Sequence, residues 1–240
     1  MFAGGFDGGY YNTQVLSSLW KDTGGTDPAT VGSPVARRDD LSGNGRHQVQ
    51  ATAAARPMLR QDGNGKYYLE HDGVDDNLAS AATFTFGQPC FMLGVATRME
   101  DSADAFMGPR KDATNYFRMR PNTSGRFASR LRGSTFNGGV DMGTAEVGGA
   151  WTVGTTKILH ALVSSNVLDC FTGNTQVGSS ADVTALGANT IALCALVTAW
   201  PLTFFFSHND YGQLVINRNL SPAERAQVLS FFSDATAVPL

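Results

Sequence analysis

The segment from Arg110 to Arg132 concentrates positive charge. It contains six arginines and one lysine against one aspartate, so its local charge is +6 (seven basic side chains minus one acidic). Alternate side chains of a strand lie on opposite faces, so Phe117 and Met119 are expected to face a core and Arg118 and Arg120 the outside. Residues 121–125 are typical of a turn, which predicts a hairpin.

The second half of this hairpin repeats the alternation, with Phe127 and Leu131 on the inner face. Guanidinium groups bind phosphate and carboxylate in a bidentate manner. The segment therefore predicts a site for an anionic ligand, such as an acidic polysaccharide or an acidic neighbouring protein, on five residues: Arg118, Arg120, Arg126, Arg130 and Arg132. The alternative is a solvated sheet face. Nucleic acid is not expected as a partner, because the net charge is −3 and no nucleic-acid-binding motif is present.

The turn at residues 72–77 concentrates oxygen ligands. Four side chains, those of Asp72, Asp75, Asp76 and Asn77, offer oxygens within six residues. Calcium prefers six to eight oxygen ligands, so this turn is a candidate calcium site, and the sequence indicates no other cofactor. The alternative is a tight turn in which the aspartates accept hydrogen bonds from backbone amides. A second turn of this kind, with Asp40, Ser42 and Asn44, favours the amide-capping interpretation more strongly.

Catalytic patterns are weak. Glycoside hydrolysis needs two carboxyl groups converging on one bond, and Glu70, Asp72 and Asp75 only approximate a Glu-x-Asp-x-x-Glu pattern. The chain has no Gly-x-Ser-x-Gly motif for a serine nucleophile, and its four histidines have no metal-ligand spacing. We therefore expect a protein without enzymatic activity.

Aromatic side chains that lie at the surface can stack on sugar rings. The candidates are Tyr10, Tyr11, Trp20, Trp151 and Trp200. Burial in a core or an interface is the favoured interpretation for most of them.

The elements that must position these groups are mainly strands. The 240 residues include 27 glycines. They also include 17 Asp but only 4 Glu, and 14 Arg but only 4 Lys, so the chain is poor in the helix-favouring residues Glu and Lys. Strands are expected at 66–69, 90–97, 157–164, 167–172, 175–177, 191–197 and 213–217, with a two-residue Gly173-Asn174 turn. The runs at 90–97 and 157–164 are apolar throughout, which predicts burial on both faces. Turn signals without β-α-β alternation predict an all-β fold, an antiparallel two-sheet sandwich.

One short helix is expected near the C-terminus. Ser221 fits the N-cap, Pro222 the first helical position, and Glu224 completes a Ser-x-x-Glu capping box. Val228, Leu229 and Phe232 then form an apolar face at helical spacing, which is expected to pack on the sandwich.

The chain lacks targeting and membrane signals. Neither a run of 18 apolar residues nor a secretory signal in residues 1–16 is present, so membrane insertion and secretion are not expected. Three scattered cysteines, Cys90, Cys170 and Cys194, indicate buried thiols rather than a disulfide framework.

Four motifs, spread over residues 17–232, resemble those of a known family. They are Ser17–Pro28 (SSLWKDTGGTDP), Asp40–Pro57 with its DLSGNGRH start, Leu69–Asp76 (LEHDGVDD), and Tyr211–Arg225 with YGQLVINR and LSPAER. Together they look like a laminin-G-like, concanavalin A-type lectin/glucanase domain of phage and prophage structural proteins. His71 departs from this pattern, which usually has an aromatic residue there.

The resemblance implies a jelly roll formed by residues 17–240, preceded by a short Gly/aromatic segment, 1–16. It implies a virion component of the fibre, spike or decoration type, made in the host cytoplasm, which attaches to host-surface glycan. The alternatives are a structural protein that binds only other virion proteins and, third, a glycan hydrolase. A homo-oligomer is expected for a virion part, and a trimer by analogy.

Overall fold

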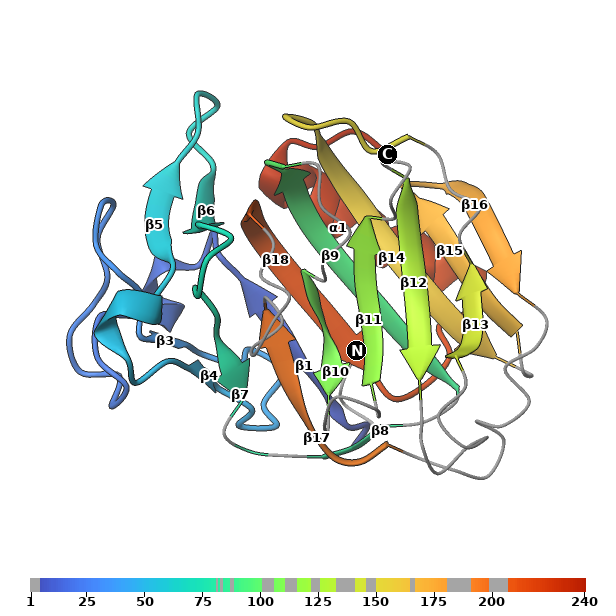
Figure 1. Ribbon diagram of the computed structural model, residues 1–240, viewed down its shortest axis with the longest axis horizontal. Helices are drawn as coiled ribbons and strands as arrows, with labels where there is room; N and C mark the ends of the chain where they lie inside the picture. The colour runs from blue at the N-terminus through green and yellow to red at the C-terminus, as the bar shows by residue number, and fades with distance from the viewer. Residues whose placement is uncertain are drawn as a thin grey trace.

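The computed structural model describes residues 5–80, 82, 84–86, 89–100, 106–110, 116–121, 126–132, 141–145, 150–164, 167–180, 191–198 and 207–240. The strands of this described part form two antiparallel sheets, packed face to face, and α1 (Pro222–Thr236) lies on the outside of one of them (Figure 1). The expected all-β sandwich with one C-terminal helix is thereby confirmed. No helix in these ranges is long and apolar enough to cross a membrane.

The first sheet has the order β16-β15-β14-β9-β18-β6-β5, and β1 also pairs with β18. Its strands are β1 (Gly8–Asn12), β5 (Met58–Gln61), β6 (Tyr67–His71), β9 (Cys90–Arg98), β14 (Thr156–Ser164), β15 (Val167–Thr172), β16 (Thr175–Ser180) and β18 (His208–Ile216). The expected strands and the Gly173-Asn174 hairpin are therefore present, and β18 begins five residues earlier than expected. Segment 1–16, which the sequence sets apart, supplies β1 of this sheet.

The second sheet has the order β13-β12-β11-β10-β17-β7-β4-β3-β2, with β8 paired to β17. Its strands are β2 (Leu19–Trp20), β3 (Arg37–Arg38), β4 (Gln48–Val49), β7 (Ala79–Ser80), β8 (Phe84–Phe86), β10 (Met107–Arg110), β11 (Tyr116–Pro121), β12 (Phe127–Arg132), β13 (Asp141–Ala145) and β17 (Ile191–Thr198). Two short 3-10 helices, Leu16–Ser18 and Ala53–Ala55, lie among the N-terminal strands.

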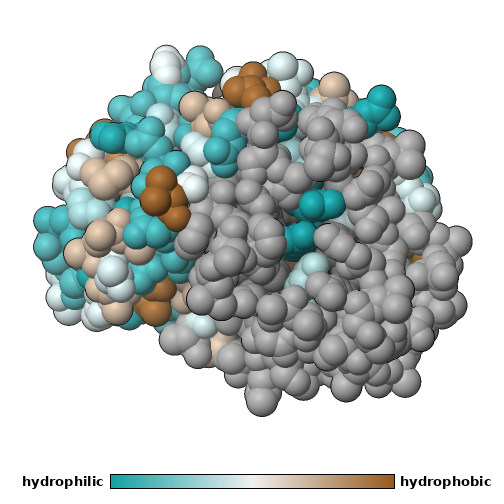
Figure 2. Space-filling model, in the orientation of Figure 1, coloured by the Kyte–Doolittle hydropathy of each residue, from teal (hydrophilic) through white to brown (hydrophobic). Residues whose placement is uncertain are grey.

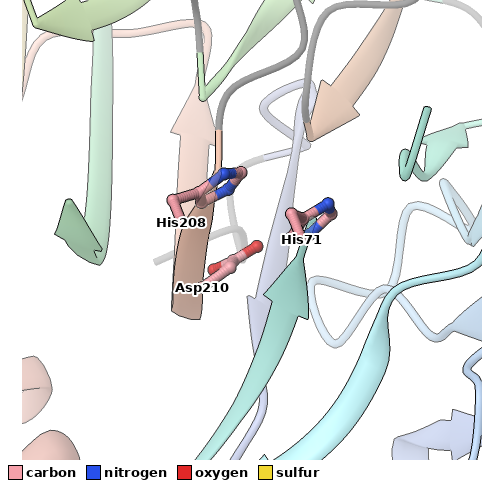
Figure 3. A group of neighbouring side chains, drawn as sticks. All are labelled: His71, His208 and Asp210. Carbon is pink, nitrogen blue, oxygen red and sulfur yellow. The ribbon is translucent and has the colours of Figure 1, made fainter. Parts of the chain in front are cut away.

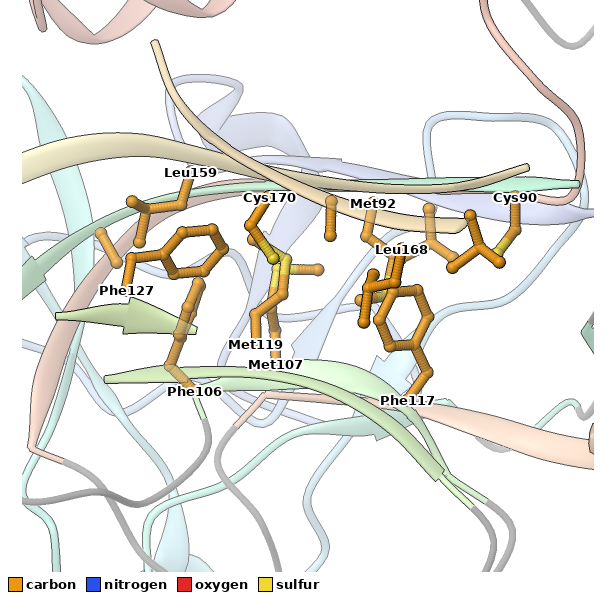
Figure 4. Close-up of a cluster of buried hydrophobic side chains, with 14 of the residues drawn as sticks. Cys90, Met92, Phe106, Met107, Phe117, Met119, Phe127, Leu159, Leu168 and Cys170 are labelled. Carbon is orange, nitrogen blue, oxygen red and sulfur yellow. The ribbon is translucent and has the colours of Figure 1, made fainter. Parts of the chain in front are cut away.

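The side chains of β9 alternate between two hydrophobic clusters. Met92 and Ala96 join the cluster between the sheets, with Phe106, Phe117 and other residues of the second sheet (Figure 4). Phe91, Leu93 and Val95 join the cluster under α1. Every residue of β9 is buried, as the continuous apolar run predicts, because both faces of the sheet are covered.

Helix α1 begins as the sequence predicts. The Ser221 side chain accepts a hydrogen bond from the Glu224 amide, and the Glu224 carboxylate accepts one from the Ser221 amide, which completes the capping box. Val228, Leu229 and Phe232 are buried against the first sheet. Cys90 and Cys170 are buried free thiols, as expected, and the side chain of Cys194 lies outside the described residues.

The close packing of the two sheets makes Gly94 sensitive to added volume. A Cβ at Gly94 would lie 2.6 Å from Met107 Sδ and 2.6 Å from a Phe106 ring carbon. We expect Gly94→Ala to lower the free energy of unfolding by about 1–3 kcal/mol, measured by urea denaturation, because the core must shift to admit the methyl group. The matched control is Gly63→Ala, where nothing lies within 4 Å. Equal stabilities of the two variants would contradict this packing.

The buried His160 should make stability depend on pH. Its ring stacks on Phe171 with centroids 4.5 Å apart, and burial, together with the charge of Arg225, lowers the pKa of His160 to about 3. The unfolded chain takes up this proton near pH 6.5, so stability is lost as the pH falls from 6.5 toward 3. Between pH 7 and pH 5 we expect the wild-type free energy of unfolding to fall by about 2 kcal/mol more than that of His160→Phe. Parallel pH dependences in urea denaturation would refute this assignment.

Candidate functional site

The arginine-rich hairpin has the expected strand alternation. β11 and β12 pair antiparallel with Arg118 opposite Arg130 and Pro121 opposite Phe127, while residues 122–125 lie outside the described part of the chain. Phe117, Met119 and Phe127 lie fully buried in the cluster between the sheets, which confirms the predicted inner face.

The outer face of this hairpin is less open than the sequence suggests. Arg118 is only 5% exposed, and its guanidinium lies over the Tyr116 ring at 5.0 Å from the centroid. Arg120 is half-buried and Arg126 is exposed. The side chains of Arg130 and Arg132 lie outside the described set. Arg118 is therefore placed to stabilise the sheet, and anion binding by the hairpin stays a prediction.

The predicted acidic turn brings its carboxylates together. Carboxylate oxygens of Asp72, Asp75 and Asp76 lie within 4.8 Å of one another. The Asp72 Oδ1 accepts hydrogen bonds from the amides of Val74 and Asp75, and the Asp76 Oδ2 accepts one from the Asp72 amide. Burial, followed by the neighbouring acidic charges, raises the pKa of Asp76 to about 6.

These contacts match the amide-capping interpretation of the acidic turn, and calcium binding there stays a prediction. The side-chain amide nitrogen of Asn77 donates a hydrogen bond to the backbone carbonyl of Asp75, so this nitrogen points toward the backbone of the turn. In the second turn, the Asp40 carboxylate accepts from the amides of Tyr10, Ser42 and Arg46, which fixes this loop against β1.

A groove lies between α1 and the strands β1 and β18 of the first sheet. Its volume is about 660 Å³, within the roughly 300–1,000 Å³ of small-ligand sites. Three aromatic rings build its wall, in edge-to-face contacts with centroids 6.1 Å apart for Tyr10 and Phe231 and 6.0 Å apart for Tyr10 and Phe232. Phe231 is 48% exposed, so part of its ring is free to contact a ligand. The remaining lining is Leu41, Ser42, Leu214, Arg218, Leu220, Glu224, Gln227 and Val228.

The polar groups of this groove are fixed in place. Arg218 donates to both carboxylate oxygens of Glu224, at 2.7 and 3.2 Å. These bonds and the amide of Ser221 hold the pKa of Glu224 at about 2, so the carboxylate is charged at neutral pH. Gln227 is exposed on the same side of α1. The groove therefore combines an aromatic wall with oriented hydrogen-bonding groups.

The sequence points to only part of this groove. Tyr10 is one of the aromatic candidates, whereas Tyr11 and Trp151 are buried, Trp20 is half-buried, and Trp200 lies outside the described residues. The sequence-based candidates do not include Phe231. Helical spacing could have identified it, because Phe231 lies beside the apolar face formed by Val228, Leu229 and Phe232 and is exposed. On the opposite face, shown in Figure 2, hydrophobic residues of the N-terminal elements occur singly among hydrophilic ones.

A network of buried polar side chains joins the two sheets. Arg38 on β3 forms an ion pair with Asp210 on β18, at 3.0 Å from Nη2 to Oδ2, and neither side chain is more than 2% exposed. The Gln48 Oε1 accepts two hydrogen bonds from Arg38, and Gln213 donates to Asp210. The guanidinium also lies over the Tyr11 ring at 5.0 Å.

Two of the three carboxyl groups in the weak catalytic pattern, those of Glu70 and Asp72, make structural contacts. Glu70 pairs with Arg60 at 2.8 Å, and the Asp72 Oδ1 accepts two amides of its own turn. Glu70, Asp72 and Asp76 nevertheless line one pocket of about 460 Å³ beside His71 and Asn209. The absence of enzymatic activity stays a prediction.

Comparison with known proteins shows the fold. No protein-family model and no curated protein sequence matches the chain. Domain 4 of AbnA, a GH43 extracellular arabinanase from Geobacillus stearothermophilus solved with arabinotriose, is similar with a TM-score of 0.60 at 11% identity, over 93% of this chain and 98% of that one. Trypanosoma rangeli sialidase has a TM-score of 0.60 at 8% identity, over 99% of this chain but 34% of the sialidase.

A third similar structure is that of botulinum neurotoxin type C, whose cell entry depends on interaction with two ganglioside molecules. It has a TM-score of 0.55 at 8% identity, over 93% of this chain and 51% of that one. The chain thus spans a third to a half of the sialidase and the toxin. Structural neighbours of this chain therefore include carbohydrate-binding β-sandwich domains, and at these identities the likeness establishes the fold.

Arg118 and Arg126 provide a matched pair within one hairpin. We expect Arg118→Ala to lower the free energy of unfolding by at least about 2 kcal/mol, because it removes a buried side chain that packs on Tyr116. Arg126→Ala, at an exposed position, should change it by no more than about 0.5 kcal/mol. Urea denaturation of both variants measures the difference, and an Arg118 variant as stable as the wild type would show that its burial contributes nothing.

Proposed function

We propose that this chain is a non-enzymatic glycan-binding domain that uses the groove between α1, β1 and β18. The observation that carries the proposal is the makeup of this groove, in which the half-exposed Phe231 faces a fixed Arg218–Glu224 pair.

The groove suits a sugar ring for a physical reason. One face of a pyranose or furanose is lined by C–H groups and packs on an aromatic ring, whereas its edge carries hydroxyls that need hydrogen-bond partners. Phe231 and Tyr10 supply apolar surface, and Gln227, Ser42 and Glu224 supply donors and acceptors. A charged acceptor such as Glu224 forms stronger hydrogen bonds to hydroxyls than a neutral one.

The fold supports the same function. A domain of similar fold was solved with arabinotriose, and the botulinum neurotoxin that shares this fold depends on gangliosides for cell entry. A binding role without catalysis is favoured because, among the described residues, the groove lining includes a single carboxylate, that of Glu224, which is ionised and paired with Arg218. Retaining and inverting glycosidases need two carboxyl groups with separated pKa values.

We further propose that this glycan-binding domain is part of a virion. The motifs that resemble phage structural proteins support it, and they include the groove residues Arg218, Leu220 and Glu224. In that setting the domain attaches a particle to host-surface polysaccharide. A purely structural domain that binds only other virion proteins is the competing role.

Glycan binding is tested with labelled protein on bacterial cells and on arrays of surface polysaccharides and arabino-oligosaccharides. We expect binding that is lost when periodate oxidises the cell-surface sugars. Phe231→Ala should weaken it at least tenfold without lowering Tm by more than about 2 °C, because Phe231 is 48% exposed.

The control is Val153→Ala, at a residue 45% exposed outside the groove, which should bind like the wild type. No binding to any cell or glycan would favour the purely structural role. Binding that survives Phe231→Ala but is lost in Arg126→Ala would transfer the site to the arginine hairpin.

A further inference from the structure

Two histidines and one aspartate lie together in the interior, and none of them lines the groove between α1, β1 and β18. His71 ends β6, and His208 and Asp210 begin β18, with His208 directly opposite His71 in the strand pairing. Each of the three offers one ligand atom within 4.8 Å of the other two, and none is more than 1% exposed. The two rings lie side by side with the Asp210 carboxylate near both (Figure 3).

The tautomer of His71 places a lone pair in the interior. Its Nδ1 lies 3.3 Å from the carbonyl oxygen of Asp76. A carbonyl only accepts hydrogen bonds, so Nδ1 carries the proton and Nε2 carries the lone pair. The Nε2 atom is fully buried and has no hydrogen-bond partner among the described residues. A buried acceptor left without a donor is unfavourable, which points to a missing ligand.

The Asp210 carboxylate is held on one side only. Within the described network, its hydrogen bond from Gln213 and its ion pair with Arg38 both fall on Oδ2. The Oδ1 atom is therefore the oxygen that a further ligand would use. Partners that hold the far side of a ligating carboxylate are typical of the shell around metal ligands.

The relative orientation of the two imidazole rings decides what metal binding requires of them. The rings stack with centroids 4.4 Å apart and planes 6° apart. Ligand atoms of a tetrahedral zinc site lie about 3.3 Å apart, and each imidazole binds the ion in its own ring plane, so one ring must turn out of the stack for both nitrogens to bind one ion.

The geometry points to one divalent transition-metal ion, of the Zn²⁺ class, bound by His71, His208 and Asp210. Two imidazole nitrogens and one carboxylate oxygen suit zinc and its neighbours rather than calcium or magnesium, which prefer all-oxygen ligands. Three protein ligands leave one coordination position for water or another ligand. The all-oxygen turn at Asp72, Asp75 and Asp76 is a separate cluster.

One of the three proposed ligands, His71, lines the pocket of about 460 Å³ that opens beside the acidic turn. This inference does not depend on glycan binding, because the groove and this pocket share no lining residue.

The test begins with the wild-type chain, stripped with EDTA and dialysed against Zn²⁺ or Co²⁺. We expect one ion per chain by elemental analysis, visible d–d absorption with Co²⁺, and a rise in Tm of about 5–10 °C with excess Zn²⁺. Paramagnetic broadening of the His71 and His208 ring signals by Co²⁺ locates the ion in the wild-type protein, so the result stands even where a buried variant fails to fold.

Variants then separate this site from others. His71→Gln and Asp210→Asn should each lose the ion, whereas His47→Gln and Asp75→Asn, which leave the triad intact, should retain it. The proposal is overturned if the wild type binds neither Zn²⁺ nor Co²⁺ when the metal ion is present at about 100 µM. It is also overturned if Co²⁺ broadens the His47 signals instead of those of His71 and His208.

Discussion

The two sheets depend on the buried ion pair between Arg38 and Asp210, which joins β3 of the second sheet to β18 of the first. Arg38 belongs to the second sheet and Asp210 to the first, and both are shielded from water. Removing two charges from water costs several kcal/mol per ion, so the pair is tolerated only with good geometry and further hydrogen bonds. Gln48, Gln213 and the Tyr11 ring supply these contacts. Loss of one partner would leave an uncompensated charge in the interior.

The β-bulge in β18 changes which side chains of this strand lie on each face of the first sheet. Its register with β9 shifts between Asp210 and Gly212. An extra residue at this point changes which face the following side chains occupy. Tyr211 therefore joins Leu214 and Ile216 in the cluster under α1, while Asp210 and Gln213 meet within the buried polar network. The α1 groove and the histidine cluster thus depend on the same strand from opposite faces.

Local patterns predict the parts of the fold that local energetics determine. The capping box at Ser221, the apolar alternation in β9 and the Gly173 turn involve residues within a few positions of one another. The pairing of β1 with β18 joins positions about 200 residues apart, and His71 lies 137 positions from His208 (208 minus 71). Sequence spacing carries no signal for such pairs, which explains why the histidines show no ligand spacing. The burial of Arg118 could not be predicted for a related reason, since alternation gives the face of a side chain but not what covers that face.

Structural neighbours at 8–11% identity show how little of the sequence the sandwich itself requires. Alternating apolar side chains and turn residues suffice for two packed sheets, so many chains reach this fold with different surfaces. This chain also contains features that alternating apolar side chains and turn residues do not account for. It keeps a charged pair and the buried His71 and His208 in the interior, where apolar residues would pack without desolvation cost. It also leaves Phe231 half-exposed beside an oriented carboxylate. The charged pair joins the two sheets, whereas neither the buried histidines nor the half-exposed Phe231 is required for two sheets to pack. The function of the chain is therefore to be sought at these histidines and at Phe231.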